Sequence, residues 1–187
     1  MADDATVYLD VSGSASLAAA DVDNVSTDNV GLDTLTLSQT NFACADLGDN
    51  TISLIATDLA GNMDSVHFTV SVLDTISPAA VAQDLTVYLD ASGAASITPA
   101  DMDNGSSDAC GVDNMSLDVT SFGCDDTGAN TVTLTVNDVN SNSSTATATV
   151  TVLDTISPVA VAQDLTVYLD ASGAASIAPA DMDNGSS

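Results

Sequence analysis

The chain has 187 residues, a formal net charge of −27, one histidine and no lysine or arginine, and its 27 acidic side chains are all aspartates. Because no cationic side chain can neutralise phosphate, the composition excludes nucleic-acid binding, docking to anionic membranes, phosphoryl transfer and Schiff-base chemistry. The hydrophobic content of 45% nevertheless predicts a folded chain. No apolar run is long enough to cross a membrane, so we expect no membrane insertion in this segment, and the opening MADDATVYLD lacks the basic and apolar regions of a signal peptide.

A repeat of 80 residues organises the chain. The pentapeptide TVYLD occurs three times at this interval, and residues 1–80 align with 81–160 without a gap, with 40 identical positions. We therefore predict one repeat domain over 1–80, a second over 81–160, and the first strands of a truncated third over 161–187. The simplest interpretation of the unfinished copy is a window from a longer tandem array.

The predicted strands alternate strictly between apolar and polar residues and are rich in valine and threonine. Clusters of Asp, Asn, Gly and Ser separate them, so that about seven short strands share each repeat, as is typical of an immunoglobulin-like sandwich. The core is small, and Tyr88 and Phe122 are its predicted aromatic residues in the second repeat. In chain order, the elements of that repeat cover 85–90, 94–97, 112–122, 130–137 and 144–153.

This pattern predicts an all-β fold of tandem immunoglobulin-like β-sandwiches arranged end to end. The connection LDTISP, at residues 73–78 and again at 153–158, is short and contains one proline, which restricts its backbone. Neighbouring sandwiches should therefore be closely coupled, as in a rod.

The cysteines predict a covalent cross-link in so small a core. Cys110 and Cys124 lie 14 residues apart in the second repeat, and closing that loop would contribute roughly 3 kcal/mol on the chain-entropy model. The first repeat has Val30 and Cys44 at the equivalent positions, so this pairing leaves Cys44 without a partner. Two interpretations of Cys44 stay open, a buried free thiol and a bond to another chain.

Acidic loops are the main candidate for a binding site. In an immunoglobulin-like topology, the loop after the second strand and the last hairpin turn lie at the same pole, close to the linker from the preceding repeat. Closely spaced carboxylates, with no Lys or Arg to offset their repulsion, predict a Ca²⁺ site at each junction. The spacing does not match an EF-hand, and hydrated Asx-turns are the alternative. The predicted metal ligands are Asp101, Asp103, Asn104, Asp108, Asp138, Asp21, Asp23, Asp28, Asp58, Asp126 and Asp154.

Catalytic residues are not expected. His67 is the only imidazole, in SVHFTVSV, where alternation places Phe68 inward and His67 toward solvent. A Ser/His/Asp triad in each repeat is therefore impossible, and no pair of aspartates stands out for acid–base chemistry. We expect that the protein is not an enzyme.

Sugar attachment is a further hypothesis. Several Asn-x-Ser/Thr sequons occur, and Asp-Thr/Ser-aliphatic triplets resemble an O-glycosylation signal of some surface-layered bacteria. Chance matches compete with this interpretation in a chain so rich in Asn, Ser and Thr. The candidate residues are Thr75, Thr155, Thr34, Ser65, Asn104 and Asn24.

The 80-residue unit resembles the hyalin-repeat-like (HYR-like) immunoglobulin-fold modules of large bacterial surface proteins. The matching pieces are PADMDNGSSDACG, FGCDDTGANTVTLTVND, the turn DLAGN at 58–62, and the exit VTVLDTISP. The exit has one proline rather than two, and extra cysteines that many such modules carry near their ends are absent. The resemblance implies an extracellular or cell-surface role in structure or adhesion.

These observations predict a structural, non-catalytic extracellular repeat protein that forms a rod or filament stabilised by calcium. The alternative is the stalk of a bacterial adhesin that binds carbohydrate or a partner protein. The expected partner is the protein itself, by end-to-end contact or by donation of the strands in 161–187, with glycans as further candidates.

Overall fold

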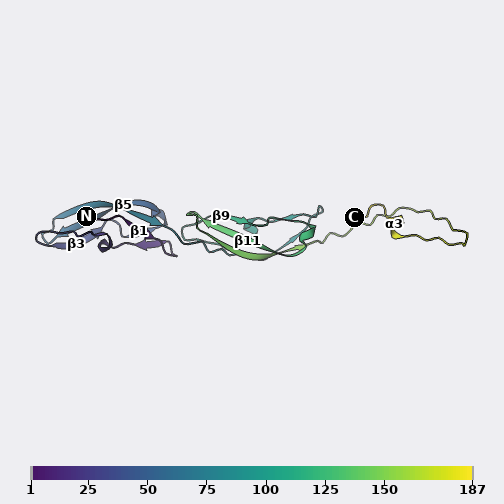
Figure 1. Ribbon diagram of the computed structural model, residues 1–187, viewed down its shortest axis with the longest axis horizontal. Coiled ribbons are helices and arrows are strands. Elements are labelled where there is room, and N and C mark those ends of the chain that lie inside the picture. The colour runs from purple at the N-terminus through teal and green to yellow at the C-terminus, as the bar shows by residue number, and fades with distance from the viewer. Residues whose placement is uncertain (1, 187) are drawn as a thin grey trace.

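The computed structural model describes residues 2–186, which form two similar β-sheet units and a third segment without strands along one long axis (Figure 1). The first unit contains six strands, a four-residue helix and a short 3-10 turn. Their bounds are β1 (Ala5–Tyr8), β2 (Ser14–Ser16), α1 (Ala19–Val22), β3 (Leu32–Leu37), β4 (Asn41–Ala43), η1 (Cys44–Asp46), β5 (Gly48–Asp58) and β6 (Met63–Leu73).

The second unit repeats the same order of elements. Its bounds are β7 (Leu85–Tyr88), β8 (Ala95–Ser96), α2 (Pro99–Met102), β9 (Val112–Leu117), β10 (Ser121–Phe122), η2 (Cys124–Asp126), β11 (Gly128–Asp138) and β12 (Ser143–Leu153). In each unit a four-stranded sheet is accompanied by a two-stranded one, in the orders β1-β6-β5-β3 with β2-β4, and β7-β12-β11-β9 with β10-β8. The predicted all-β, sandwich-like fold is therefore confirmed.

Each unit starts and finishes on neighbouring strands. β1 pairs in parallel with β6, and β7 pairs in parallel with β12, whereas the long hairpins β5-β6 and β11-β12 are antiparallel. Because the first and last strands run the same way, the chain enters a unit at one pole and leaves it at the other. This topology places successive units one after another.

Alternation along the long hairpins forms the cores. In β11, Val132, Leu134 and Val136 are fully buried, and in β12 Val150 and Val152 are too, while the intervening threonines point away. Val7, Leu9, Phe42 and Phe68 occupy the corresponding core of the first unit.

Three details differ from the sequence-based expectation. Each unit has six strands rather than about seven, and short helices occupy part of the predicted loops, with Pro99 supplying the fixed φ of a first helical turn in α2. Tyr88 is not a core residue, since it is 60% exposed. The neighbours Val87 and Leu89 face inward, so strand alternation turns Tyr88 to the outer face.

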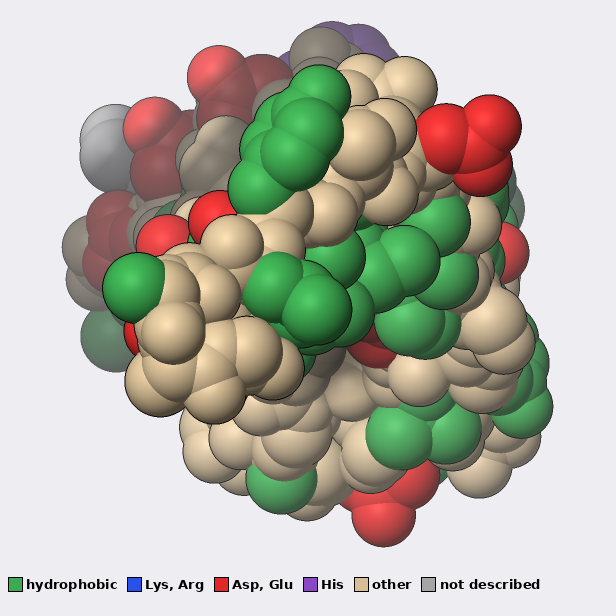
Figure 2. Space-filling model, turned by 90° about the vertical axis from the view of Figure 1, so that its right-hand side faces the viewer, with side chains coloured by type: hydrophobic (Ala, Val, Ile, Leu, Met, Phe, Trp, Pro, Cys, Tyr) green, Lys and Arg blue, Asp and Glu red, His purple; other side chains and the backbone are tan. Residues whose placement is uncertain are grey.

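The third segment, residues 154–186, has a short helix α3 (Pro179–Met182) and turns but no strand. Leu169 is 68% exposed, although its counterpart Leu89 is 3% exposed in the second unit. Figure 2 shows hydrophobic side chains gathered on this end of the molecule, with aspartates around them and no lysine or arginine. Within residues 2–186, no helix is long and apolar enough to cross a membrane.

Candidate functional site

A disulfide joins the two units. Cys44 begins the η1 turn of the first unit, and Cys110 lies in the loop before β9 of the second; their sulfurs are 2.09 Å apart and their Cα atoms 5.2 Å apart. The predicted Cys110–Cys124 pair is therefore wrong, and so are both interpretations of Cys44. Cys110 lies at the pole of the second unit that faces the first. Cys124 follows β10, beside Gly93 at the opposite pole, so the 14-residue separation spans the length of the sandwich.

The two poles touch beside this bond. Gly13, in the turn after β1, has a φ of +75°, and a Cβ added to it would lie 2.8 Å from Cys44 Sγ and 3.2 Å from Ala109 Cβ. Only glycine fits this close approach without a clash, and the left-handed backbone also favours it. The turn of the first unit and the Cys110 loop are therefore in direct contact.

The linker is hydrogen-bonded to the second unit. Asn142, in the β11-β12 turn, donates its side-chain amide to the main-chain oxygen of Asp74 at 3.3 Å and to Asp138 Oδ2 at 2.8 Å. Ser144 Oγ donates to the main-chain oxygen of Pro78 at 2.5 Å. These bonds and the disulfide fix the direction in which the second unit leaves the first.

An acidic cluster lies at the same junction. Among residues 2–186, one group of three metal-capable side chains has its ligand atoms within 4.8 Å of one another, and it consists of Asp74, Asp108 and Cys110. The Cys110 sulfur is held in the disulfide, which leaves the two carboxylates as ligands. At that separation they repel each other by roughly 3 kcal/mol for an effective dielectric of 20. Neither carboxylate has a cationic side chain to offset this repulsion, because the chain has no Lys or Arg.

One further oxygen at this pole lacks a partner. Asn140, in the β11-β12 turn, has a buried Oδ1 that accepts no hydrogen bond, the only buried side-chain polar atom of that kind in the described part of the chain. A buried carbonyl oxygen is normally satisfied by a donor, a water or a cation. Carboxylate and amide oxygens are the ligands that Ca²⁺ prefers, so Asp74, Asp108 and Asn140 offer oxygens of the right chemistry at this pole.

The predicted metal ligands do not converge as a set. Each of the ten aspartates accepts a main-chain N–H in its own turn, at 2.7 to 3.0 Å, which satisfies one carboxylate oxygen locally. Only Asp108 belongs to the three-residue group, and Asn142 connects Asp138 to the same linker. The Asx-turn contact, a bond from the N–H two residues further on, is present at Asp28, Asp58, Asp108, Asp138 and Asp154. Asp21, Asp101 and Asp126 instead accept the N–H three residues before them, as in a capping box. The predicted ligands left outside the cluster are Asp138, Asp101, Asp103, Asn104, Asp21, Asp23, Asp28, Asp58, Asp126 and Asp154.

Hydrogen bonding in these turns favours the ionised carboxylates. The side-chain amide of Asn62 holds the pKa of Asp58 below its ordinary value, and the hydroxyl of Ser106 does the same for the pKa of Asp103. The Thr98 hydroxyl likewise lowers the pKa of Asp101. The turns therefore stabilise negative charge one residue at a time.

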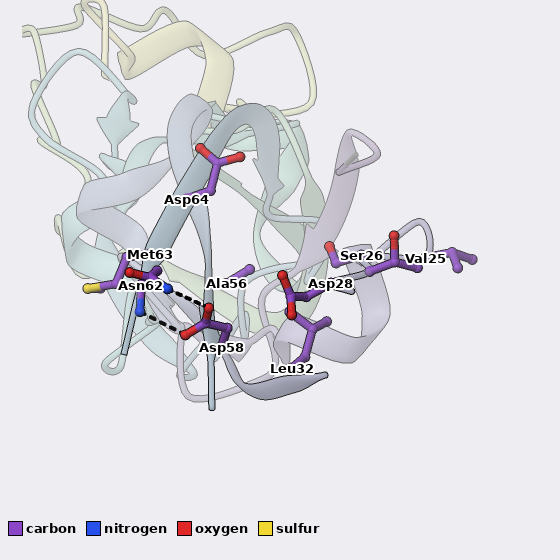
Figure 3. A pocket seen from close by; sticks show the side chains of 10 residues that line it. Val25, Ser26, Asp28, Leu32, Ala56, Asp58, Asn62, Met63 and Asp64 are labelled. Carbon is purple, nitrogen blue, oxygen red and sulfur yellow. Dashed lines mark hydrogen bonds between the residues drawn. The ribbon is translucent and has the colours of Figure 1, made fainter. Parts of the chain in front are cut away.

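The first unit has an open version of the junction pole. Asp28, Asp58 and Asn62 occupy the positions of Asp108, Asp138 and Asn142, and they line a pocket of about 400 Å³ together with Asp64. Figure 3 shows Asn62 hydrogen-bonded to Asp58 on one side of this pocket and Asp28 on the other. In the second unit, the linker from the first unit reaches Asn142 at this pole.

Sequence reasoning missed Asp74 and the Cys44–Cys110 bond. A signal for the first was present, because Asp74 is the counterpart of the predicted Asp154 one repeat earlier. His67 is exposed as predicted, with Nδ1 2.9 Å from Ser53 Oγ. The six glycosylation candidates are also exposed, which permits modification without demonstrating it: Thr34, Ser65, Thr75, Thr155, Asn24 and Asn104.

No family model and no curated protein matches the chain. Among solved structures, one similar protein is an endo-fucoidan hydrolase of glycoside hydrolase family 107, with 20% sequence identity and a TM-score of 0.28. The match covers 66% of this chain and 22% of the hydrolase chain. The mouse clustered protocadherin PcdhgC3 EC1-3 is 13% identical over 81% of this chain and 65% of its own, with a TM-score of 0.37. The human mucin-like protocadherin EC1-2 is 14% identical over 82% of this chain and 96% of its own, with a TM-score of 0.36.

Proposed function

We propose that the chain is a structural, non-catalytic part of an extracellular rod or filament, built from HYR-like repeats. The observation that carries this proposal is the junction, where a disulfide, a close loop contact and two linker hydrogen bonds hold one unit to the next. Two independent modules would need none of these. A spacer needs all of them, because its reach depends on stiff joints.

Small-angle X-ray scattering tests the stiff junction. We expect the oxidised chain to have the maximum dimension and narrow distance distribution of two aligned units. The variant Cys44→Ser/Cys110→Ser should show a broader distribution at unchanged circular dichroism. An oxidised chain that already scatters as two freely rotating modules contradicts the rod.

Calcium is the second part of the proposal. Asp74, Asp108 and Asn140 would hold the ion at the junction, where it would neutralise two facing carboxylates. Chelation should lower the melting temperature by many degrees, and added Ca²⁺ should restore it. The rise in melting temperature on adding Ca²⁺ should disappear in the variants Asp74→Asn and Asp108→Asn. It should persist in Asp154→Asn, because Asp154 is the exposed counterpart of Asp74. A melt that does not change in excess EDTA rules the ion out.

Self-association is the third part. The third segment exposes Leu169, Ile177 and Met182, whose counterparts Leu89, Ile97 and Met102 are buried in the second unit. End-to-end packing or strand donation to another copy would cover them. Sedimentation velocity tests this, since Leu169→Asp/Ile177→Asp should abolish any assembly that wild-type chains form. Wild-type chains that stay monomeric at high concentration contradict it.

The adhesin stalk is a second candidate, and one observation favours it. Tyr8, Tyr88 and Tyr168 recur every 80 residues and are all at least 60% exposed. Exposed aromatic rings supply apolar contact area for a partner or for the face of a sugar. Glycan-array binding that is lost in Tyr8→Ser/Tyr88→Ser would support the stalk, and an absence of binding would leave the rod.

A further inference from the structure

Cys124 occupies in the second unit the position that Cys44 occupies in the first. Cys124 Sγ lies 3.8 Å from the main-chain oxygen of Gly93, and Cys44 Sγ lies 3.8 Å from that of Gly13. Both cysteines begin a short 3-10 turn at the end of the β2-β4 or β8-β10 pair. The local structure around the two sulfurs is therefore the same.

The cradle that receives the sulfur is also repeated. A Cβ added to Gly93, whose φ is +74°, would lie 2.6 Å from Cys124 Sγ, as one added to Gly13 would lie 2.8 Å from Cys44 Sγ. Asp126 Oδ2 accepts the N–H of Gly123 at 2.7 Å. In the first unit, Asp46 Oδ2 accepts the N–H of Ala43 at 2.8 Å in the same way. At Gly13, Ala109 of the next unit completes the contact; at Gly93 that place is open. The surroundings of Cys124 therefore match those of Cys44, although no neighbouring unit contacts them in the described part of the chain.

Cys124 lies where the chain leaves the second unit. Leu89 donates its N–H to the oxygen of Leu153 at 2.9 Å, and Asp90 and Gly93 follow in the next turn, beside Cys124. Residues 154–186, the opening of the third repeat, continue from this same pole. Cys124 is exposed and carries a free thiol in the described chain.

We propose that Cys124 is one half of a second inter-repeat disulfide. It would bond a cysteine that a unit stacked on this pole presents at the position of Cys110, as Cys44 bonds Cys110. This assignment goes beyond the proposed rod, because it names the residue that locks the next joint.

The chemistry is a two-electron oxidation. The two thiols lose two protons and two electrons and form one S–S bond, while a low-molecular-weight disulfide such as oxidised glutathione is reduced to two thiols. Cys110 itself is not available as a partner, because it is bonded to Cys44 at the opposite pole. The Cys44–Cys110 bond shows that this loop and this turn reach bonding distance when repeats stack.

The test completes the third repeat. A copy of residues 108–160 is joined after Ser187, the counterpart of Ser107, with Ile in place of Val at the copied positions 112 and 119 as mass tags. The product has five cysteines, three original and two copied. After equilibration with oxidised and reduced glutathione, an endoproteinase that cleaves before aspartate separates all five. We expect the untagged peptide 118–124 to be linked to the tagged copy of 108–112, and 33–45 to be linked to the untagged 108–112. The tagged copy of 118–124 should carry a free thiol.

A second extension keeps the test independent of how the first one folds. It copies residues 28–80 and carries cysteine at the counterpart of Val30, while the matched control keeps the valine. Cys124 should be bonded in the cysteine version and fully alkylated in the control. Circular dichroism confirms that each extension has folded.

Two results overturn the assignment. One is a free Cys124 in both cysteine-carrying extensions when they are folded. The other is a link between the untagged peptides 108–112 and 118–124. Either result leaves the rod intact, provided that Cys44 and Cys110 remain bonded and the scattering remains that of aligned units. The failure of the cross-link and the failure of the rod are therefore distinguishable.

Discussion

Asn142 donates its side-chain amide both to the carboxylate of Asp138, at 2.8 Å, and to the main-chain oxygen of Asp74, at 3.3 Å. One side chain thus connects the last turn of the second unit to the segment that leaves the first. Asn62 makes the equivalent bond to Asp58 at 2.7 Å but contacts no preceding linker in the described chain. The two asparagines form a natural comparison between a joined pole and an open one.

We expect Asn142→Ala to destabilise the second unit by about 2 kcal/mol. Asp138 is only 2% exposed, so its carboxylate would lose a donor that water cannot readily replace. Asn62→Ala should cost less, because water can reach the open pocket beside Asp58. Urea denaturation followed by circular dichroism measures both changes. An equal or larger loss at Asn62 would show that the linker contact adds nothing.

The inter-unit disulfide predicts a specific peptide map. Digestion before aspartate without reduction should give 33–45 linked to 108–112, with 118–124 as a free thiol peptide. Closing a loop of 66 residues contributes about 4 kcal/mol on the chain-entropy model, so reduction should lower the melting temperature. Recovery of 108–112 linked to 118–124 would instead support a bond within the second unit.

Gly13→Ala should weaken the junction more than a glycine substitution elsewhere. The new Cβ would meet Cys44 Sγ and Ala109 Cβ, in addition to the cost of the left-handed backbone. Gly48→Ala is the matched control, because Gly48 has a φ of +96° and no atom within 4 Å of the added carbon. We expect faster reduction of the disulfide by dithiothreitol in Gly13→Ala only. Equal reduction rates in the two variants would mean that the close contact of Gly13 with Cys44 does not affect the Cys44–Cys110 disulfide.

Asp118 predicts a pH-dependent difference in stability. Its Oδ1 accepts the N–H of Thr133 at 2.8 Å, which holds the pKa of Asp118 below its ordinary value of 3.8. A lowered pKa in the folded state gives stability that is present above pH 3.8 and is lost as the pH falls through the folded pKa. The first unit has Ser38 here, which accepts the N–H of Ser53 at 3.0 Å without a charge.

Asp118→Ser should therefore be less stable than the wild type at pH 6, by less than about 1 kcal/mol because the site is exposed. The difference should vanish once the pH falls below the folded pKa of Asp118. Asp113→Ser removes the same charge without removing a main-chain hydrogen bond, and so controls for the overall repulsion. Thermal melts between pH 6 and acidic pH measure the stability difference between the wild type and Asp118→Ser. A difference that grows on acidification would contradict a lowered pKa of Asp118 in the folded state.

Periodicity explains what could be predicted. Alternation in β11 and β12 identified Val132, Leu134 and Val150 as core residues, because a strand buried on one face must place every second side chain there. The same rule, applied strictly, would have placed Tyr88 outside, between the inward Val87 and Leu89. The acidic turns were also recognisable, since Asp followed by Gly, Ser or Asn is typical of a side chain that caps its own turn.

The disulfide could not be predicted from spacing. Cys110 and Cys124 are close in sequence but lie at opposite poles, whereas Cys44 and Cys110 are 66 residues apart and meet because units stack. Loop length along the chain contains no information about contacts between domains. The alignment of repeats held the missing clue, because Cys44 and Cys124 share one position and Cys110 has no counterpart in the first repeat.

The Cys44–Cys110 bond also sets the path of mechanical load through the chain. When the two ends are pulled, tension passes from Cys44 directly to Cys110 and bypasses the linker and strands β5 to β8. The bypassed segment stores about 230 Å of extensible chain, which becomes available only when the bond is reduced. An oxidising environment would thus keep this segment out of the extensible length of the protein, and a reducing one would release it.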